Sequence, residues 1–465
     1  MTDTAFSTVT DLRDGFAAGT LSPAAVMDRY LEQIAAHDEK LHAFVTVYAD
    51  DARLAADAAE KAQKAGHRVG PLHGVPIAMK DIVDMEGRVT TGGSLPWSDR
   101  ISPTTATLVE RLVAAGMIVI GKTHTVEFAM GGWGTNQHMG TPWNPWDAAV
   151  HRTPGGSSAG SGVSVAAGMA PCAIGTDTGG SVRLPAAWCG LVGLKTTIGR
   201  ISTHGVLPLA STLDTPGPMC RTVEDAALIY NAMQGPDPKD HHTKGVDFED
   251  PLPQMRRGVA GLRLARMGDR EREIVDAEVL AAYDASLETL AGQGAEIVDV
   301  TLPGRFTGLG AITGKIIGAE GYLFVGDRVD DMSLQIDEDV RPRIWIGKEM
   351  SAREYLEILQ QREAIKSAYD EALAGIDAYL TPTTATPAIP LTEVDQDETP
   401  ATFTRVVNLL DRCALSIPNG MTAGGLPTSL QIMCGAYDEA TALRIGWAFE
   451  QATDWVNRVP EGYAG

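Results

Sequence analysis

The chain is poor in cysteine, in basic residues and in long hydrophobic runs. Its 465 residues hold five scattered cysteines, so neither a disulfide framework nor a zinc site is expected, and the thiols suit a reducing cytoplasm. Lys and Arg number 38 against 60 Asp and Glu, a net charge of −22, which argues against nucleic acid or an anionic membrane as partner. No run approaches the roughly 18 apolar residues of a membrane-spanning helix, and no signal peptide is indicated.

The most informative segment runs from Gly155 to Pro185 and holds two glycine-rich turns, each with a serine. These serines are Ser157 and Ser181. Upstream, Lys80 ends a short apolar stretch, GVPIAMK, which has the length and flanking residues of a buried strand. The combination indicates a hydroxyl nucleophile whose base is a lysine.

Hydrophobic periodicity and turn residues predict alternating helices and strands, which favours a layered α/β fold. Ser22 and Pro23 form a helix start signal, because serine caps the free N–H groups and proline fits the first helical position. A Pro-, Asp- and Gly-rich stretch at 235–257 predicts a linker or surface loop. Further helices are expected at 50–65, 103–115, 276–291, 351–373 and 439–455, and strands at 74–80, 117–120 and 295–300.

Other catalytic plans fit the sequence poorly. Ser158 lies in a G-x-S-x-G pattern, but Pro154 disfavours the strand that a nucleophile elbow needs, and no histidine follows His242. The S-x-x-K, Walker and H-E-x-x-H patterns are absent. We expect no metal and no organic cofactor.

A lysine can act as base only when it is neutral, and burial favours the neutral form. Ser157 could then relay a proton from Ser181 to Lys80, and the backbone N–H groups around Gly179 could stabilise an oxyanion. The residues alone leave a second interpretation open, in which the glycines only make tight turns and Lys80 pairs with Asp81.

The segments GVPIAMKD, PGGSSAGSG and GTDTGGSVRLPAAWCGLVGLKTT resemble the amidase signature family. The resemblance is colinear over about residues 5–235 and 375–455, and includes GMIVIGKTHTVEF, GTPWNPWD, GPMCRTVEDAA and IPNGMTAGGLPTSLQIM. It implies one large α/β/α domain over residues 1–465 with a mixed central sheet. The signature core would span about 70–235, and a variable, substrate-shaping region about 240–370.

The resemblance also implies roles for individual residues. Lys80 would be the base, Ser157 the relay, joined through a cis peptide bond, and Ser181 the nucleophile that forms an acyl-enzyme. The oxyanion hole would consist of the backbone N–H groups of Thr178, Gly179, Gly180 and Ser181. Asp177 and Arg183 would either support this loop or form a plain surface ion pair. The chain departs from the family pattern at Ala159 and Asp411, where glycine is usual.

The expected function is hydrolysis of an aryl or hydrophobic, anilide-like amide by a cytoplasmic amidase. An apolar pocket wall is expected from Met130, Gly131, Trp133, Ile312, Ile316, Ile317 and Trp345. The expected partner is a small-molecule amide, without nucleic acid or membrane, and a homodimer is compatible with the sequence. Two alternatives share the same residues: the glutamine-amidating subunit of a tRNA-dependent amidotransferase, and a carbamate or ester hydrolase.

Overall fold

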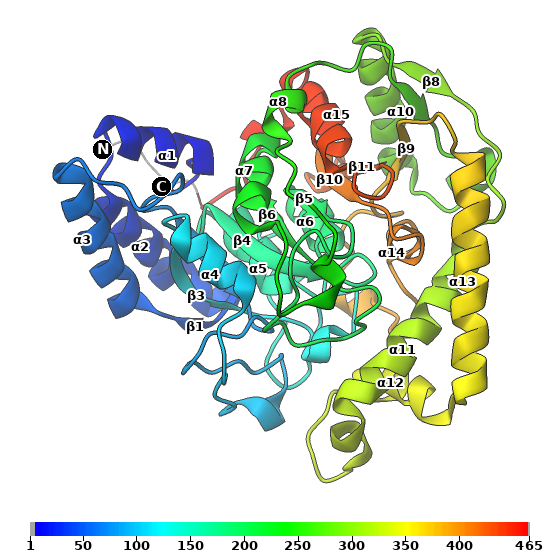
Figure 1. The fold of residues 1–465 in the computed structure, drawn as a ribbon, viewed down its shortest axis with the longest axis horizontal. Helices are drawn as coiled ribbons and strands as arrows, with labels where there is room; N and C mark the ends of the chain where they lie inside the picture. Colours follow the sequence, from blue (N-terminus) through cyan, green and yellow to red (C-terminus); the bar gives the residue numbers. More distant parts are fainter. Residues whose placement is uncertain (1–4, 464–465) are drawn as a thin grey trace.

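A single mixed sheet forms the centre of the molecule in the computed structural model, which describes residues 5–463 (Figure 1). Within these residues the sheet has eleven strands in the order β1-β3-β2-β4-β6-β5-β10-β11-β9-β7-β8. The strands are β1 Phe44–Val47, β2 Pro76–Lys80, β3 Ile118–Thr123, β4 Cys172–Asp177, β5 Val192–Lys195, β6 Thr215–Cys220, β7 Arg263–Ala265, β8 Glu296–Val298, β9 Ala378–Pro382, β10 Ala414–Met421 and β11 Pro427–Met433.

Helices connect the strands and cover the sheet. The α-helices are α1 Val9–Ala18, α2 Pro23–Leu41, α3 Ala49–Lys64, α4 Thr107–Ala114, α5 Ala159–Ala166, α6 Arg183–Cys189, α7 Val223–Met233, α8 Leu252–Met255, α9 Asp269–Arg272, α10 Ala277–Gly292, α11 Phe306–Asp330, α12 Val340–Glu349, α13 Ala352–Ala372, α14 Arg405–Leu409 and α15 Glu439–Gln451. Short 3-10 turns occur at Leu95–Trp97, Glu127–Ala129, His241–Thr243, Leu391–Glu393 and Trp455–Asn457.

The sheet separates two hydrophobic cores, because side chains alternate between its faces. In β2, Ile77 and Met79 belong to the larger core, whereas Ala78 belongs to the smaller one. Helices α5 and α6 contact each other and the sheet, and α15 contacts α7, α10 and the sheet. The expected α/β class with a mixed sheet in a single domain is confirmed. The same alternation directs the side chain of Lys80, like that of Ala78, to the face of the sheet that α5 covers.

The strongest sequence signals correspond to real elements. The Ser22 side chain accepts a hydrogen bond from the Ala25 N–H, and Pro23 begins α2. Helix α4 begins at Thr107, later than the expected residue 103. Helix α11 was not expected, because six of its 25 residues are glycine and glycine lowers helix propensity.

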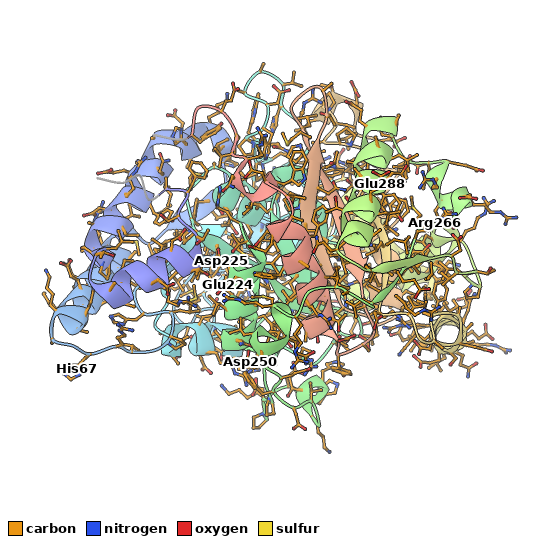
Figure 2. The ribbon with its side chains drawn as sticks, turned by 90° about the horizontal axis from the view of Figure 1, so that it is seen from above. His67, Glu224, Asp225, Asp250, Arg266 and Glu288 are labelled. Carbon is orange, nitrogen blue, oxygen red and sulfur yellow. The ribbon has the colours of Figure 1, made fainter. Side chains whose placement is uncertain are left out.

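Helices α11, α12 and α13 lie together at one end of the molecule (Figure 1). They belong to the region that we expected to be variable. Helix α1 lies on the side away from α11–α13 (Figure 1). The buried carboxylate of Asp225 on α7, labelled in Figure 2, accepts hydrogen bonds from the N–H groups of Val9 and Thr10, and so ties α1 to the body of the fold. Across residues 5–463, every helix falls short of the length and apolarity needed to cross a membrane.

Candidate active site

Lys80 is fully buried at the end of β2, and its Nζ lies 2.7 Å from Oγ of Ser157 and 2.9 Å from Oγ1 of Thr176. The interpretation in which Lys80 pairs with Asp81 is wrong. The carboxylate of Asp81 is instead 3.3 Å from Nζ of Lys122 and accepts a hydrogen bond from Thr91. Burial lowers the pKa of Lys80 to about 7, against the raising effects of Asp214 and Asp177. A large fraction of this amine is therefore neutral at physiological pH.

Ser157 is positioned by the segment that leads into α5. The peptide bond between Gly156 and Ser157 is cis, as the resemblance implied. The Gly156 N–H donates to the Gly132 carbonyl, and the Ser157 carbonyl accepts from the Val126 N–H. These backbone contacts hold the Ser157 hydroxyl against Lys80.

Ser181 lies in the turn between β4 and α6, where it is 8% exposed and faces a cavity. Gly180 has φ +132°, which favours glycine. The expectation that Gly180 contributes to an oxyanion hole needs correction, because its N–H donates to the Asp177 carboxylate at 2.7 Å. Among residues 5–463, the N–H groups of Gly179 and Ser181 have no hydrogen-bond acceptor, so both are donors available to a ligand.

A buried polar network fixes this turn. Arg183 donates to both carboxylate oxygens of Asp177, at 2.8 and 2.9 Å, and neither side chain is exposed. It is therefore not a surface ion pair. Burial alone would raise the pKa of Asp177, but Arg183 together with Lys195 and Asn408 lowers it to about 2. The other acceptors of Arg183 are Thr404, Asn408 and Gln431.

Sequence reasoning missed Asp214, which is buried beneath the same turn. Its carboxylate accepts a 2.5 Å hydrogen bond from Oγ1 of Thr178 and further bonds from the N–H groups of Leu209 and Ala210. Burial raises the pKa of Asp214 to about 6, partly offset by these hydrogen bonds. The only sequence signal was its position in STLDTPGP, next to β6.

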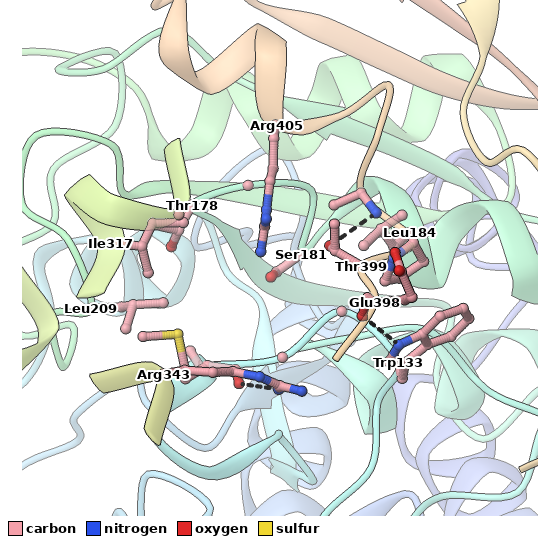
Figure 3. Close-up of a pocket in the computed structure, with 18 of the residues that line it drawn as sticks. Trp133, Thr178, Ser181, Leu184, Leu209, Ile317, Arg343, Glu398, Thr399 and Arg405 are labelled. Carbon is pink, nitrogen blue, oxygen red and sulfur yellow. Dashed lines mark hydrogen bonds between the residues drawn. The ribbon is translucent and has the colours of Figure 1, made fainter. Parts of the chain in front are cut away.

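Ser181 opens into a cavity of about 310 Å³ (Figure 3). Of the residues expected in its wall, Met130, Gly131, Trp133 and Ile317 line it. Ile316 does not, because it packs fully buried in the main core. Trp345 does not either, and its Nε1 donates to Asp330. Ile312 is likewise absent from the wall.

The wall is less apolar than expected. Trp133 stacks on Trp188 with ring centroids 5.6 Å apart, so one face of its ring belongs to the protein interior. Three cationic side chains that sequence reasoning missed also line the cavity, namely Lys315, Arg343 and Arg405. No sequence pattern marked them, because single arginines and lysines are common on helices.

A metal-ligating geometry occurs elsewhere. Within residues 5–463, the one group of three candidate ligands is Asp240, His241 and His242, whose ligand atoms lie within 4.8 Å of one another. The Asp240 carboxylate is already used by the N–H groups of Thr203 and His242. This group stands in the 3-10 turn after α7 and is absent from the cavity wall.

Comparison with known proteins places this geometry in a family. The family model described as Amidase matches residues 25–443. A protein of Halorhodospira halophila that is named as a subunit of glutamyl-tRNA(Gln) amidotransferase is 36% identical over 483 residues, which cover 98% of this chain and 99% of that protein. The crystal structure of the corresponding protein from Thermotoga maritima has a TM-score of 0.82 at 30% identity, covering 97% and 96% of the two chains. The peptide amidase of Stenotrophomonas maltophilia has a TM-score of 0.87 at 28% identity, covering 99% of each.

These relatives correct the expected function. Proteins from several bacteria that carry the same glutamyl-tRNA(Gln) amidotransferase name are 34% to 38% identical over nearly the whole chain. The expectation of an anilide-like, hydrophobic amide as substrate is therefore wrong, and the amidotransferase alternative is better supported. We expected no nucleic acid among the partners of the chain. The names of these relatives refer to a tRNA and do not support that expectation. The chain belongs to the amidase signature family and is an enzyme that acts on the carbon–nitrogen bond of amides.

Proposed function

We propose that this chain is the amide-donating subunit of a tRNA-dependent amidotransferase, and that it releases ammonia from the side-chain amide of glutamine. The observation that carries the chemistry is the 2.7 Å contact between Lys80 Nζ and Ser157 Oγ, close to a cavity that Ser181 lines. The names of the full-length relatives support glutamyl-tRNA as the acceptor of the amide nitrogen.

The reaction has two steps, and Ser181 is the nucleophile in the first. As its Oγ attacks the carboxamide carbon, its proton passes to Ser157, and the Ser157 proton passes to neutral Lys80. The N–H groups of Gly179 and Ser181 hold the developing oxyanion, and each such donor contributes roughly 10²–10³ in rate. Return of the proton releases ammonia and leaves a glutamyl ester on Ser181.

Water then hydrolyses the ester. Lys80 again accepts a proton through Ser157, this time from the attacking water, and glutamate leaves as Ser181 regains its hydrogen. Bonds change only at Ser181, the carboxamide and the attacking water, and Ser157 and Lys80 carry the protons between them.

The acceptor step requires another protein. The chain has a net charge of −22, and tRNA binding depends on basic surface. We therefore assign tRNA binding to partner subunits, which would receive the ammonia that this chain releases.

The test is ammonia release from glutamine by the purified chain, alone and with the partner subunits of an amidotransferase. The expected result is Ser181-dependent glutamine cleavage that is strongest in the complex with glutamyl-tRNA present. Ser181→Ala is the negative control, and Ser158→Ala is a matched control on the neighbouring buried serine. Hydrolysis of simple amides without any glutamine cleavage, with or without partners, would overturn the proposal.

A further inference from the structure

Two guanidinium groups face the cavity without an anionic partner. Arg405 begins α14, Arg343 lies on α12, and both line the cavity that contains Ser181. Figure 3 shows the Arg405 side chain extending toward Ser181. Within residues 5–463, no carboxylate oxygen lies within 4.0 Å of either guanidinium.

The contacts of Arg405 leave its charge uncompensated. Among the residues that the structure describes, its side chain has one hydrogen-bond acceptor, the Gly310 carbonyl at 3.4 Å from Nη1. Burial, together with the nearby positive charge of Arg343, lowers the pKa of Arg405 to about 10. The guanidinium of Arg343 has more hydrogen-bond acceptors than that of Arg405, because it donates to the Met130 carbonyl and to the side chain of Gln396.

Arg405 and Arg343 are both partly shielded from solvent. An unpaired cation that loses part of its hydration costs free energy, and folded proteins rarely keep one without a counter-ion. Acidic residues outnumber basic ones by 60 to 38 in this chain, so a counter-ion was readily available. The acidic residues of the wall, Asp397 and Glu398, are exposed at its edge. The missing anion is therefore expected to arrive with the ligand.

The surrounding glycines make room for this arrangement. A Cβ on Gly179 would lie 3.2 Å from Cγ of Arg405, and a Cβ on Gly314 would lie 3.6 Å from its Nη1. Gly179 also supplies one of the free N–H groups beside Ser181. An anion bound by Arg405 would consequently lie close to the carbonyl that Ser181 attacks.

We propose that Arg405 binds a carboxylate on the acyl part of the substrate and thereby selects acidic amides over neutral ones. A planar carboxylate matches the planar fork of a guanidinium. The inference rests on the proposed function for the reaction at Ser181, but it concerns substrate charge. Glutamine belongs to the acidic class through its α-carboxylate, and its α-ammonium would be directed toward Asp397 and Glu398.

The first test compares glutaramate with glutaramide, which differ only by a carboxylate in place of a second carboxamide. The wild-type ratio of kcat/KM should favour glutaramate by roughly 30-fold or more, because pairing with a partly desolvated charge is strong. Arg405→Gln should bring this ratio toward one, and Arg405→Lys should retain part of it. Arg353, which is 86% exposed on α13, gives the control Arg353→Gln, in which the ratio should stay as in wild type.

The second test measures binding without turnover, by titrating glutarate into Ser181→Ala in a calorimeter. Binding should be lost when Arg405→Gln is added, while the melting temperature does not fall. Cleavage of glutaramate but not of glutamine would overturn the proposed donor and leave the carboxylate site standing. Cleavage of glutamine with a ratio that Arg405→Gln does not change, or glutarate binding that does not depend on Arg405, would overturn the carboxylate site alone.

Discussion

Asp214 influences Lys80 without forming an ion pair with it: its charge is the largest single factor that opposes the loss of the Lys80 proton. Replacing Asp214 by Asn removes that charge and keeps an acceptor for the Thr178 hydroxyl. The pKa of Lys80 should then fall, so the acid limb of the kcat/KM profile should move to lower pH. Measurement between pH 5 and 9 checks this, and a shift to higher pH would contradict it.

Lys80 also links folding stability to pH. Its folded-state pKa of about 7 lies below the ordinary value of 10.5. Below pH 7 both states are protonated, and the cost of burying the charge is fully present. Between pH 7 and 10.5 the unfolded chain binds the extra proton, so stability from this group should rise by about 1.4 kcal/mol per pH unit.

Lys80→Met should therefore be inactive but more stable than wild type at pH 6, with a smaller gain at pH 9. Urea unfolding at the two pH values measures the difference. A variant less stable than wild type at pH 6 would show that the contacts of Lys80 with Ser157 and Thr176 outweigh its burial cost.

Ser181→Ala should abolish turnover, with a loss on the order of 10⁴-fold or more. The variant should keep the fold, because only one partly accessible oxygen is removed. A fluorophosphonate should label the wild-type enzyme at Ser181. Ser158 is fully buried, and its hydroxyl lies 3.3 Å from the Thr176 amide nitrogen. Mass spectrometry that places the label on Ser158 would contradict the assignment of the nucleophile.

The Asp177–Arg183 pair should be important for stability. Arg183→Met leaves the Asp177 carboxylate buried without its main partner, which typically costs about 3–5 kcal/mol. The double variant with Asp177→Asn should lose less than the sum of the single losses, because each single change leaves an unpaired charge. Denaturant unfolding of the four proteins measures this coupling, and strict additivity would show that the two residues act independently.

The side chains that we propose as catalytic could be located from the sequence, because Lys80 and Ser181 lie in short segments whose glycines and apolar residues determine local structure. Asp411 was noted as a departure where glycine is usual, and its φ of +53° explains the preference. Its carboxylate accepts the Ile198 N–H at 3.3 Å, a contact that glycine lacks.

The cavity wall was predicted less well. Ile317 lines it and Ile316 does not, a difference of one position on α11, whose glycine-rich sequence gives no clear amphipathic face. Arg405 was missed because its importance comes from tertiary packing against Gly179, far away in the chain. Such a contact has no local signature in sequence.

The network around Asp177 has a consequence for the synthesis of the protein. The turn that bears the proposed nucleophile belongs to the first half of the chain, but its Arg183 is held by Thr404, Asn408 and Gln431. A nascent chain on the ribosome carries Ser181 long before these residues emerge. The enzyme thus remains without a completed site through most of its translation, and an N-terminal fragment that ends before residue 404 would carry Lys80, Ser157 and Ser181 and still lack the frame that holds them.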